Sequence, residues 1–129
     1  MNGGETFRLV GVADRHTWVV LSDPSQDANH VLIVSFTSYT HGIGMDDSCV
    51  VETCEFALLT NRSCLYYADV REATSAMLQT IQKAGRLQWR VAVPGVLLQR
   101  IRDGAGASGE CKKKYKDLLT TQGLIAPAH

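Results

Sequence analysis

Apolar residues in the first half of the chain form short runs separated by polar turns, a pattern that predicts β-strands. Residues 17–22 and 31–37 are the clearest runs, and the turn sequence Asp-Pro-Ser-Gln-Asp-Ala-Asn lies between them. Because the run 31–37 is almost continuously apolar, we expect it to form a strand that is buried on both faces. Four weaker runs predict further strands, at residues 7–12, 48–52, 56–59 and 63–70.

After residue 70 the spacing of the apolar residues becomes helical. Ala73, Met77, Leu78 and Ile81 recur on one face of a helix, and Gly85 stands where a C-terminal cap falls. The sequence therefore predicts that a first helix follows the strands.

The rest of the chain continues this change of pattern. Residues 89–93 predict a last short strand. Pro94 opens a second helix that ends at Gly104, and Ser108 caps a third, shorter helix. Because strands come first and helices last, the sequence predicts an α+β fold.

The length of 129 residues suits one domain with a single core, so we expect residues 1–129 to form a single domain. Within it, about residues 7–70 are predicted to form a small β-barrel, and about residues 71–119 a helical C-terminal part.

Charge and hydropathy limit the classes of partner. The 13 basic and 13 acidic residues cancel, so no overall field attracts the chain to nucleic acid or to an anionic membrane, and any anion site must be a local patch. No apolar run reaches the roughly 18 residues that a membrane helix needs. The amino terminus does not have the pattern of a signal peptide. We therefore expect a cytoplasmic protein with no membrane partner.

The four cysteines, at positions 49, 54, 64 and 111, lack the close pairing that is typical of zinc sites. Nothing in the sequence indicates secretion, so reduced thiols are expected rather than disulfides. The sequence predicts neither a metal site nor a cofactor.

Polar side chains stand where the two clearest strands begin and end. Arg15 and His16 precede the first strand, and Thr37 and Ser38 close the second. An imidazole titrates near neutral pH and can serve as a base or an acid, while an arginine can hold a phosphate by a bidentate fork. The competing interpretation is structural. A histidine at a strand start is more often a surface or hydrogen-bonded structural residue, and hydroxyls at a strand end often only form a turn.

These residues resemble the MazF/PemK family of toxin ribonucleases, over about residues 10–70. Arg15-His-Thr-Trp-Val-Val-Leu-Ser22 is similar to the family's strand Arg-Pro-Val-Leu-Val-Leu-Ser, with a different residue in place of the proline. Val31-Leu-Ile-Val-Ser-Phe-Thr-Ser38 is similar to the family strand that ends in Thr-Thr or Thr-Ser. Residues 63–70 resemble a later strand at the family's dimer interface.

The resemblance implies a small SH3-like (PemK-like) antiparallel β-barrel with C-terminal helices, in a homodimer partnered by an antitoxin protein. It implies metal-independent cleavage of single-stranded RNA, with tyrosines that stack on splayed bases. The catalytic residues are then His16, Arg62 and Thr37, and the substrate-binding residues are Arg15, Ser38, Tyr39, His41, Ser63 and Tyr66.

A second prediction is a non-catalytic binding module on the same barrel, which grips a protein or nucleic acid between residues 37 and 47. This alternative is favoured because the family's acidic residue with a nearby arginine has no clear equivalent. Arg62 and Asp69, the nearest candidates, stand seven residues apart and on opposite strand faces. A third alternative is a structural subunit in which strand 63–70 serves only dimerisation.

Overall fold

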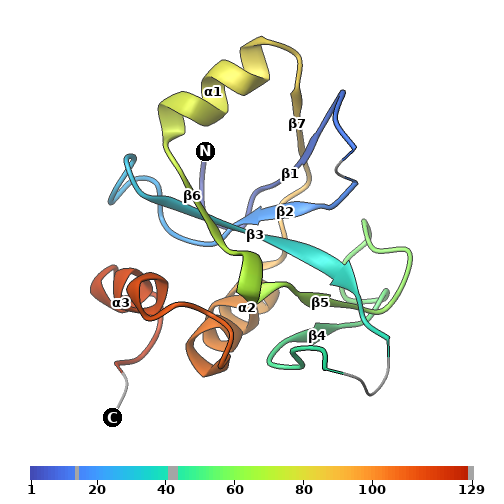
Figure 1. Ribbon diagram of the computed structural model, residues 1–129, viewed down its shortest axis with the longest axis vertical. Coiled ribbons are helices and arrows are strands. Elements are labelled where there is room, and N and C mark those ends of the chain that lie inside the picture. The colour runs from blue at the N-terminus through green and yellow to red at the C-terminus, as the bar shows by residue number, and fades with distance from the viewer. Residues whose placement is uncertain (14, 41–43, 128–129) are drawn as a thin grey trace.

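The structure is a computed structural model that describes residues 1–13, 15–40 and 44–127. It contains an antiparallel sheet with helices on both faces, which confirms the predicted α+β class (Figure 1). The strands are β1 (Thr6–Leu9), β2 (Trp18–Val20), β3 (Val31–Ser38), β4 (Val50–Val51), β5 (Ser63–Leu65), β6 (Arg71–Ala73) and β7 (Leu87–Arg90). The helices are the short 3-10 helix η1 (Tyr67–Asp69), α1 (Ser75–Lys83), α2 (Gly95–Ala107) and α3 (Lys113–Thr121).

The sheet is open. Its strand order is β4-β5-β3-β2-β1-β7, and β6 pairs with β3 outside this path. Within the described ranges, the end strands β4 and β7 do not pair with each other. The predicted closure into a barrel is therefore not observed, and the SH3-like assignment stays a prediction.

Strand β3 is the centre of the sheet. Its residues 33–35 pair with β2 along one edge. Residues 31–33 pair with β6 along the other edge, and residues 36–38 pair with β5. Leu32, Val34 and Phe36 join the core on one face, while Val31 and Ile33 join the core on the opposite face. Its residues 31–36 are all buried, which confirms the predicted strand with two buried faces.

Helices cover the two faces unequally. Helix α1 lies on one side of the sheet, and α2 and α3 lie on the other (Figure 1). Leu78 of α1 packs in a small cluster with Phe7 and Trp18. The larger cluster contains Leu97 and Ile101 of α2 and residues of α3. The chain therefore encloses two apolar layers rather than the interior of a barrel.

The predicted strand at residues 56–59 is wrong, because these residues form turns. The amide of Glu55 donates to the carbonyl of Glu52, and the amide of Leu59 donates to that of Phe56, as in successive tight turns. Phe56 still reaches the core and stacks on Phe36, with ring centroids 5.9 Å apart. The apolar residues at 56–59 thus belong to a loop that packs against the core, and not to a strand.

Other boundaries also differ from the prediction. The stretch 71–119 is not purely helical, because β6 and β7 lie within it and β7 begins two residues before the predicted strand at 89–93. The strand predicted at 63–70 is interrupted by η1. Helix α2 continues past Gly104, where the sequence predicted its end, to Ala107.

Gly104 lets α2 approach η1 closely. Tyr67 is 1% exposed, and its hydroxyl donates a 2.7 Å hydrogen bond to the carbonyl of Ile101. Burial raises the pKa of this phenol, which therefore stays protonated as a donor. A Cβ atom at Gly104 would overlap the Tyr67 Oη and lie 2.9 Å from the Cβ of Cys49. The glycine is therefore required by packing.

We expect Gly104→Ala to lower the free energy of unfolding by about 1–3 kcal/mol through overpacking, although alanine is the better helix former by about 1 kcal/mol. Gly106→Ala in the same helix is the matched control, because its Cβ meets only the flexible end of Ile125, at 3.3 Å. This control should be neutral or slightly stabilising. Urea unfolding of both variants measures the difference, and equal stabilities would contradict the packing argument.

Candidate functional site

A hollow of about 280 Å³ lies where β2 begins and β3 ends. Most of the residues singled out in the sequence meet there: Arg15, His16, Thr37, Ser38 and Ser63 all line it. The opposite wall is the loop of residues 58–61. The structure thus brings together polar groups from three segments that are separate in the sequence.

Antiparallel pairing explains why these residues meet. Trp18 pairs with Ser35, and the amide of Phe36 donates a 2.9 Å hydrogen bond to the carbonyl of Thr17, so the register continues beyond the strand. Continued by one more residue, the register sets His16 opposite Thr37. The position of the imidazole next to the hydroxyl therefore follows from the pairing of two buried strands.

The other edge of β3 brings in the third segment. Ser38 pairs with Ser63 of β5, and the amide of Tyr39 donates a 2.9 Å hydrogen bond to the carbonyl of Arg62. The Ser63 side chain is buried, and its hydroxyl donates to the carbonyl of Asn61 at 2.9 Å. Ser63 therefore shapes the turn beneath the hollow, while the exposed Ser38 hydroxyl is available to a ligand.

The electrostatics of the hollow favour an anion. No aspartate or glutamate is among its described lining residues. Arg15 is exposed and has no ion-pair partner among residues 1–13, 15–40 and 44–127. His16 is also exposed and adds an imidazole ring. A guanidinium, an imidazole and hydroxyl donors around one small space can bind and transfer protons to a phosphate ester.

Three of the predicted site residues that the structure describes, Arg62, Tyr39 and Tyr66, are not part of this lining. Arg62 is half exposed, and its Nε lies 2.8 Å from Oε1 of Glu52. This ion pair lies outside the hollow and neutralises the charge of Arg62. Tyr39 is partly buried next to the hollow but does not line it. His41 lies outside the described residues. Arg15, not Arg62, is the arginine that the structure brings to His16.

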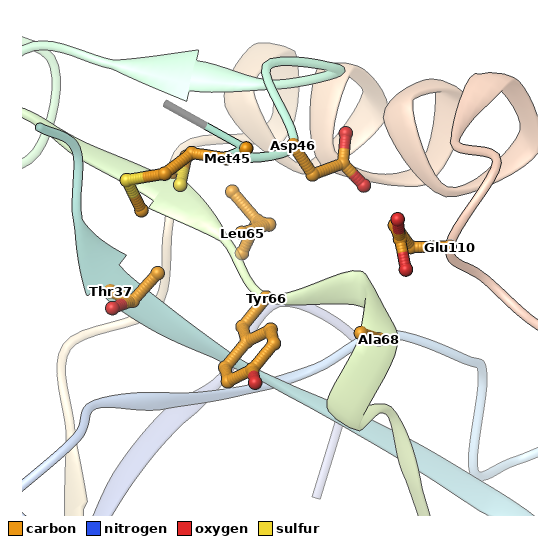
Figure 2. Close-up of a pocket in the computed structure, with 9 residues that line it drawn as sticks. Thr37, Met45, Asp46, Leu65, Tyr66, Ala68 and Glu110 are labelled. Atoms are coloured by element: carbon orange, nitrogen blue, oxygen red, sulfur yellow. The ribbon is translucent and has the colours of Figure 1, made fainter. Parts of the chain in front are cut away.

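A second hollow, of about 420 Å³, opens on the other side of Thr37 (Figure 2). Figure 2 shows Tyr66 at one side of it and the carboxylates of Asp46 and Glu110 at the other. Tyr66 is 46% exposed, so part of its side chain is accessible to a ligand. Thr37 lines both hollows and connects them.

Asp46 has a structural role in this second hollow. Its carboxylate accepts hydrogen bonds from the Ser48 amide, at 3.0 Å, and from the hydroxyls of Ser48 and Ser108. Burial raises its pKa, but the hydrogen bonds from Ser108 and Ser48 outweigh burial, so its pKa is lowered overall. An ionised Asp46 thus joins the loop before β4 to the end of α2.

Sequence reasoning missed the loop wall of the site. Leu58 and Leu59 line the hollow because the predicted strand is a loop that folds back over the end of β3. The turn residue Asn61 is the signal in the sequence that marks this reversal.

No family model matches the chain, and no curated protein matches it. In the part of the chain that the structure describes, no three histidine, cysteine, aspartate or glutamate side chains are grouped so that they could hold a metal ion. None of the described helices has the length and apolar composition needed to cross a membrane.

We expect Asp46→Asn to lower the free energy of unfolding at pH 7 by about 1–2 kcal/mol, because an ionised acceptor of hydrogen bonds is lost. The folded-state pKa of Asp46 lies below its unfolded value of 3.8, so its stabilisation is complete above about pH 5 and is lost as the pH falls through the folded-state pKa. The difference between wild type and variant should therefore shrink towards pH 3, which urea unfolding at both pH values measures.

The matched control for this prediction is Asp47→Asn, which removes the neighbouring exposed carboxylate. It should leave the stability nearly unchanged at both pH values. A loss as large as that of Asp46→Asn would show that the general charge of the loop, and not the bonds from Ser48 and Ser108, is responsible.

Proposed function

We propose that the protein is a metal-independent endoribonuclease of the MazF/PemK type, and that it cleaves single-stranded RNA in the hollow next to His16. The observation that carries this proposal is the meeting of Arg15, His16, Thr37 and Ser38 around one space with no carboxylate in its described lining. The proposal includes an SH3-like (PemK-like) fold, a homodimeric toxin, a cognate antitoxin and a cytoplasmic location, as the sequence analysis predicts.

The reaction assigned to this site is attack of a ribose 2′-hydroxyl on the adjacent phosphate. The O2′–P bond forms and the P–O5′ bond breaks, which leaves a 2′,3′-cyclic phosphate and a free 5′-hydroxyl. His16 accepts the proton of the 2′-hydroxyl, and water at the open side of the hollow protonates the leaving oxygen. Arg15 stabilises the charge that develops on the phosphate, and the hydroxyls of Thr37 and Ser38 donate hydrogen bonds to its oxygens.

The test is incubation of the purified protein with a long single-stranded RNA in excess EDTA. Wild type should give discrete fragments, and His16→Ala should cleave about 10²–10⁴-fold more slowly because general base catalysis is lost. Arg15→Gln should lose at least about tenfold through weaker charge stabilisation. End analysis of the fragments should find cyclic phosphates.

Arg62→Gln is the matched control, because it removes the same charge from an arginine that pairs with Glu52 outside the hollow. It should keep nearly full activity. If the wild-type protein leaves RNA intact, or if His16→Ala cleaves as fast as wild type, the proposal fails.

The second candidate function is a binding module without catalysis. It is favoured by the lack of a second proton-transfer group beside His16 among the described lining residues. Tight binding of RNA or a protein that does not change in His16→Ala, together with no cleavage, would support this alternative.

A further inference from the structure

A third hollow, of about 570 Å³, adjoins the candidate site and is lined by three arginines, Arg8, Arg15 and Arg90. Arg15 and Thr17 line both this hollow and the candidate site, so the two are neighbours across these side chains. We refer to the space between Arg8, Arg15 and Arg90 as the arginine hollow.

The pairing of the first strand with the last places two of these arginines together. Arg8 of β1 pairs with Gln88 of β7, and Arg90 stands two residues beyond Gln88 on the same face of the sheet. Diagonal neighbours of this kind are close enough for long side chains to reach the same ligand. Arg15 approaches from the segment that precedes β2, on the side of the candidate site.

Within the described residues, no ion pair compensates the charge of these arginines. Arg8, Arg15 and Arg90 are exposed, and none forms an ion pair with any residue that the structure describes. No carboxylate is among the described lining of the arginine hollow. Some other arginines are ion-paired: Arg71, for example, pairs with Asp69. In a chain whose net charge is zero, this group is a local cationic patch.

We propose that the arginine hollow binds the phosphate backbone of a single RNA strand next to the phosphate held at His16. The inference rests on the proposed function for the identity of the strand. Guanidinium groups hold phosphate oxygens by paired hydrogen bonds and do not read bases, so Arg8 and Arg90 add affinity without sequence preference.

The hollow in Figure 2 is unsuited to this role. Its Asp46 and Glu110 carboxylates repel a phosphate, whereas the exposed Tyr66 ring offers a surface for a base. The backbone of the strand therefore leaves the candidate site on the side of Arg8 and Arg90.

The experiment measures binding of a labelled, 2′-O-methylated RNA octamer, which cannot be cleaved, by fluorescence anisotropy at several salt concentrations. Arg8→Gln and Arg90→Gln should each weaken binding about fivefold and reduce the slope of log K against log salt by about 0.7, the value for one phosphate contact on a single strand. An octamer with neutral methylphosphonate linkages should bind wild type and these variants equally.

Lys83→Gln is the control for loss of one charge, because Lys83 is exposed on α1, which covers the opposite face of the sheet. It should change octamer affinity by less than about twofold. Thermal unfolding of all variants should be close to that of wild type, since the substituted side chains are exposed.

The outcomes separate this inference from the proposed function. If wild type does not bind the octamer, or if Arg8→Gln and Arg90→Gln behave like Lys83→Gln, the arginine hollow is not a phosphate site. An equal loss with the neutral octamer would also overturn it. Salt-dependent binding through Arg8 and Arg90 without any cleavage in EDTA would keep this inference and reject the ribonuclease.

Discussion

The structure depends on β3, which is paired along both edges and buried on both faces. A slip of its register by one residue would exchange the two faces and move Val34 out of the layer covered by α2 into the layer covered by α1. The same register places Thr37 next to the segment of His16 and Ser38 next to Ser63. Correct packing of the core and assembly of the candidate site therefore both depend on the register of β3.

The candidate site begins where this burial ends. Residues 31–36 are buried, whereas Thr37 is half-buried and Ser38 is exposed. At this point β3 leaves the space between the helices, so its side chains meet solvent while its backbone is still held by β5. Hydroxyls at this position combine a fixed backbone with access to a ligand, which is the combination that a binding site needs.

Much of this arrangement could be predicted from the sequence, because it follows from local patterns. The two clear apolar runs predicted β2 and β3. The polar residues at the ends of these runs, Arg15, His16 and Thr37, were predicted as site residues, and they line the hollow. The strand predicted at 56–59 failed because four apolar residues can reach a core from a loop as well as from a strand. Closure of the sheet also failed as a prediction, since it depends on how distant edges meet.

The arginine hollow could not be predicted for the same reason. Arg8 and Arg90 lie near opposite ends of the sequence, and only the pairing of β1 with β7 makes them neighbours. Likewise, nothing in the sequence distinguishes Arg15 from Arg62, whereas in the fold Glu52 neutralises Arg62 and the charge of Arg15 stays uncompensated within the described ranges.

A balanced composition can therefore conceal a directed electrostatic field. The protein carries equal numbers of basic and acidic residues, but several of its carboxylates are used in ion pairs away from the candidate site, such as Asp69 with Arg71. Three arginines without an ion pair among the described residues, Arg8, Arg15 and Arg90, lie together at the end of the sheet that also holds the imidazole of His16. Over a Debye length of about 8 Å at physiological salt, an approaching anion responds to these nearby charges and hardly to the net charge of the chain. A chain with no net charge can thus attract a polyanion to one part of its surface, and the fold determines which part that is.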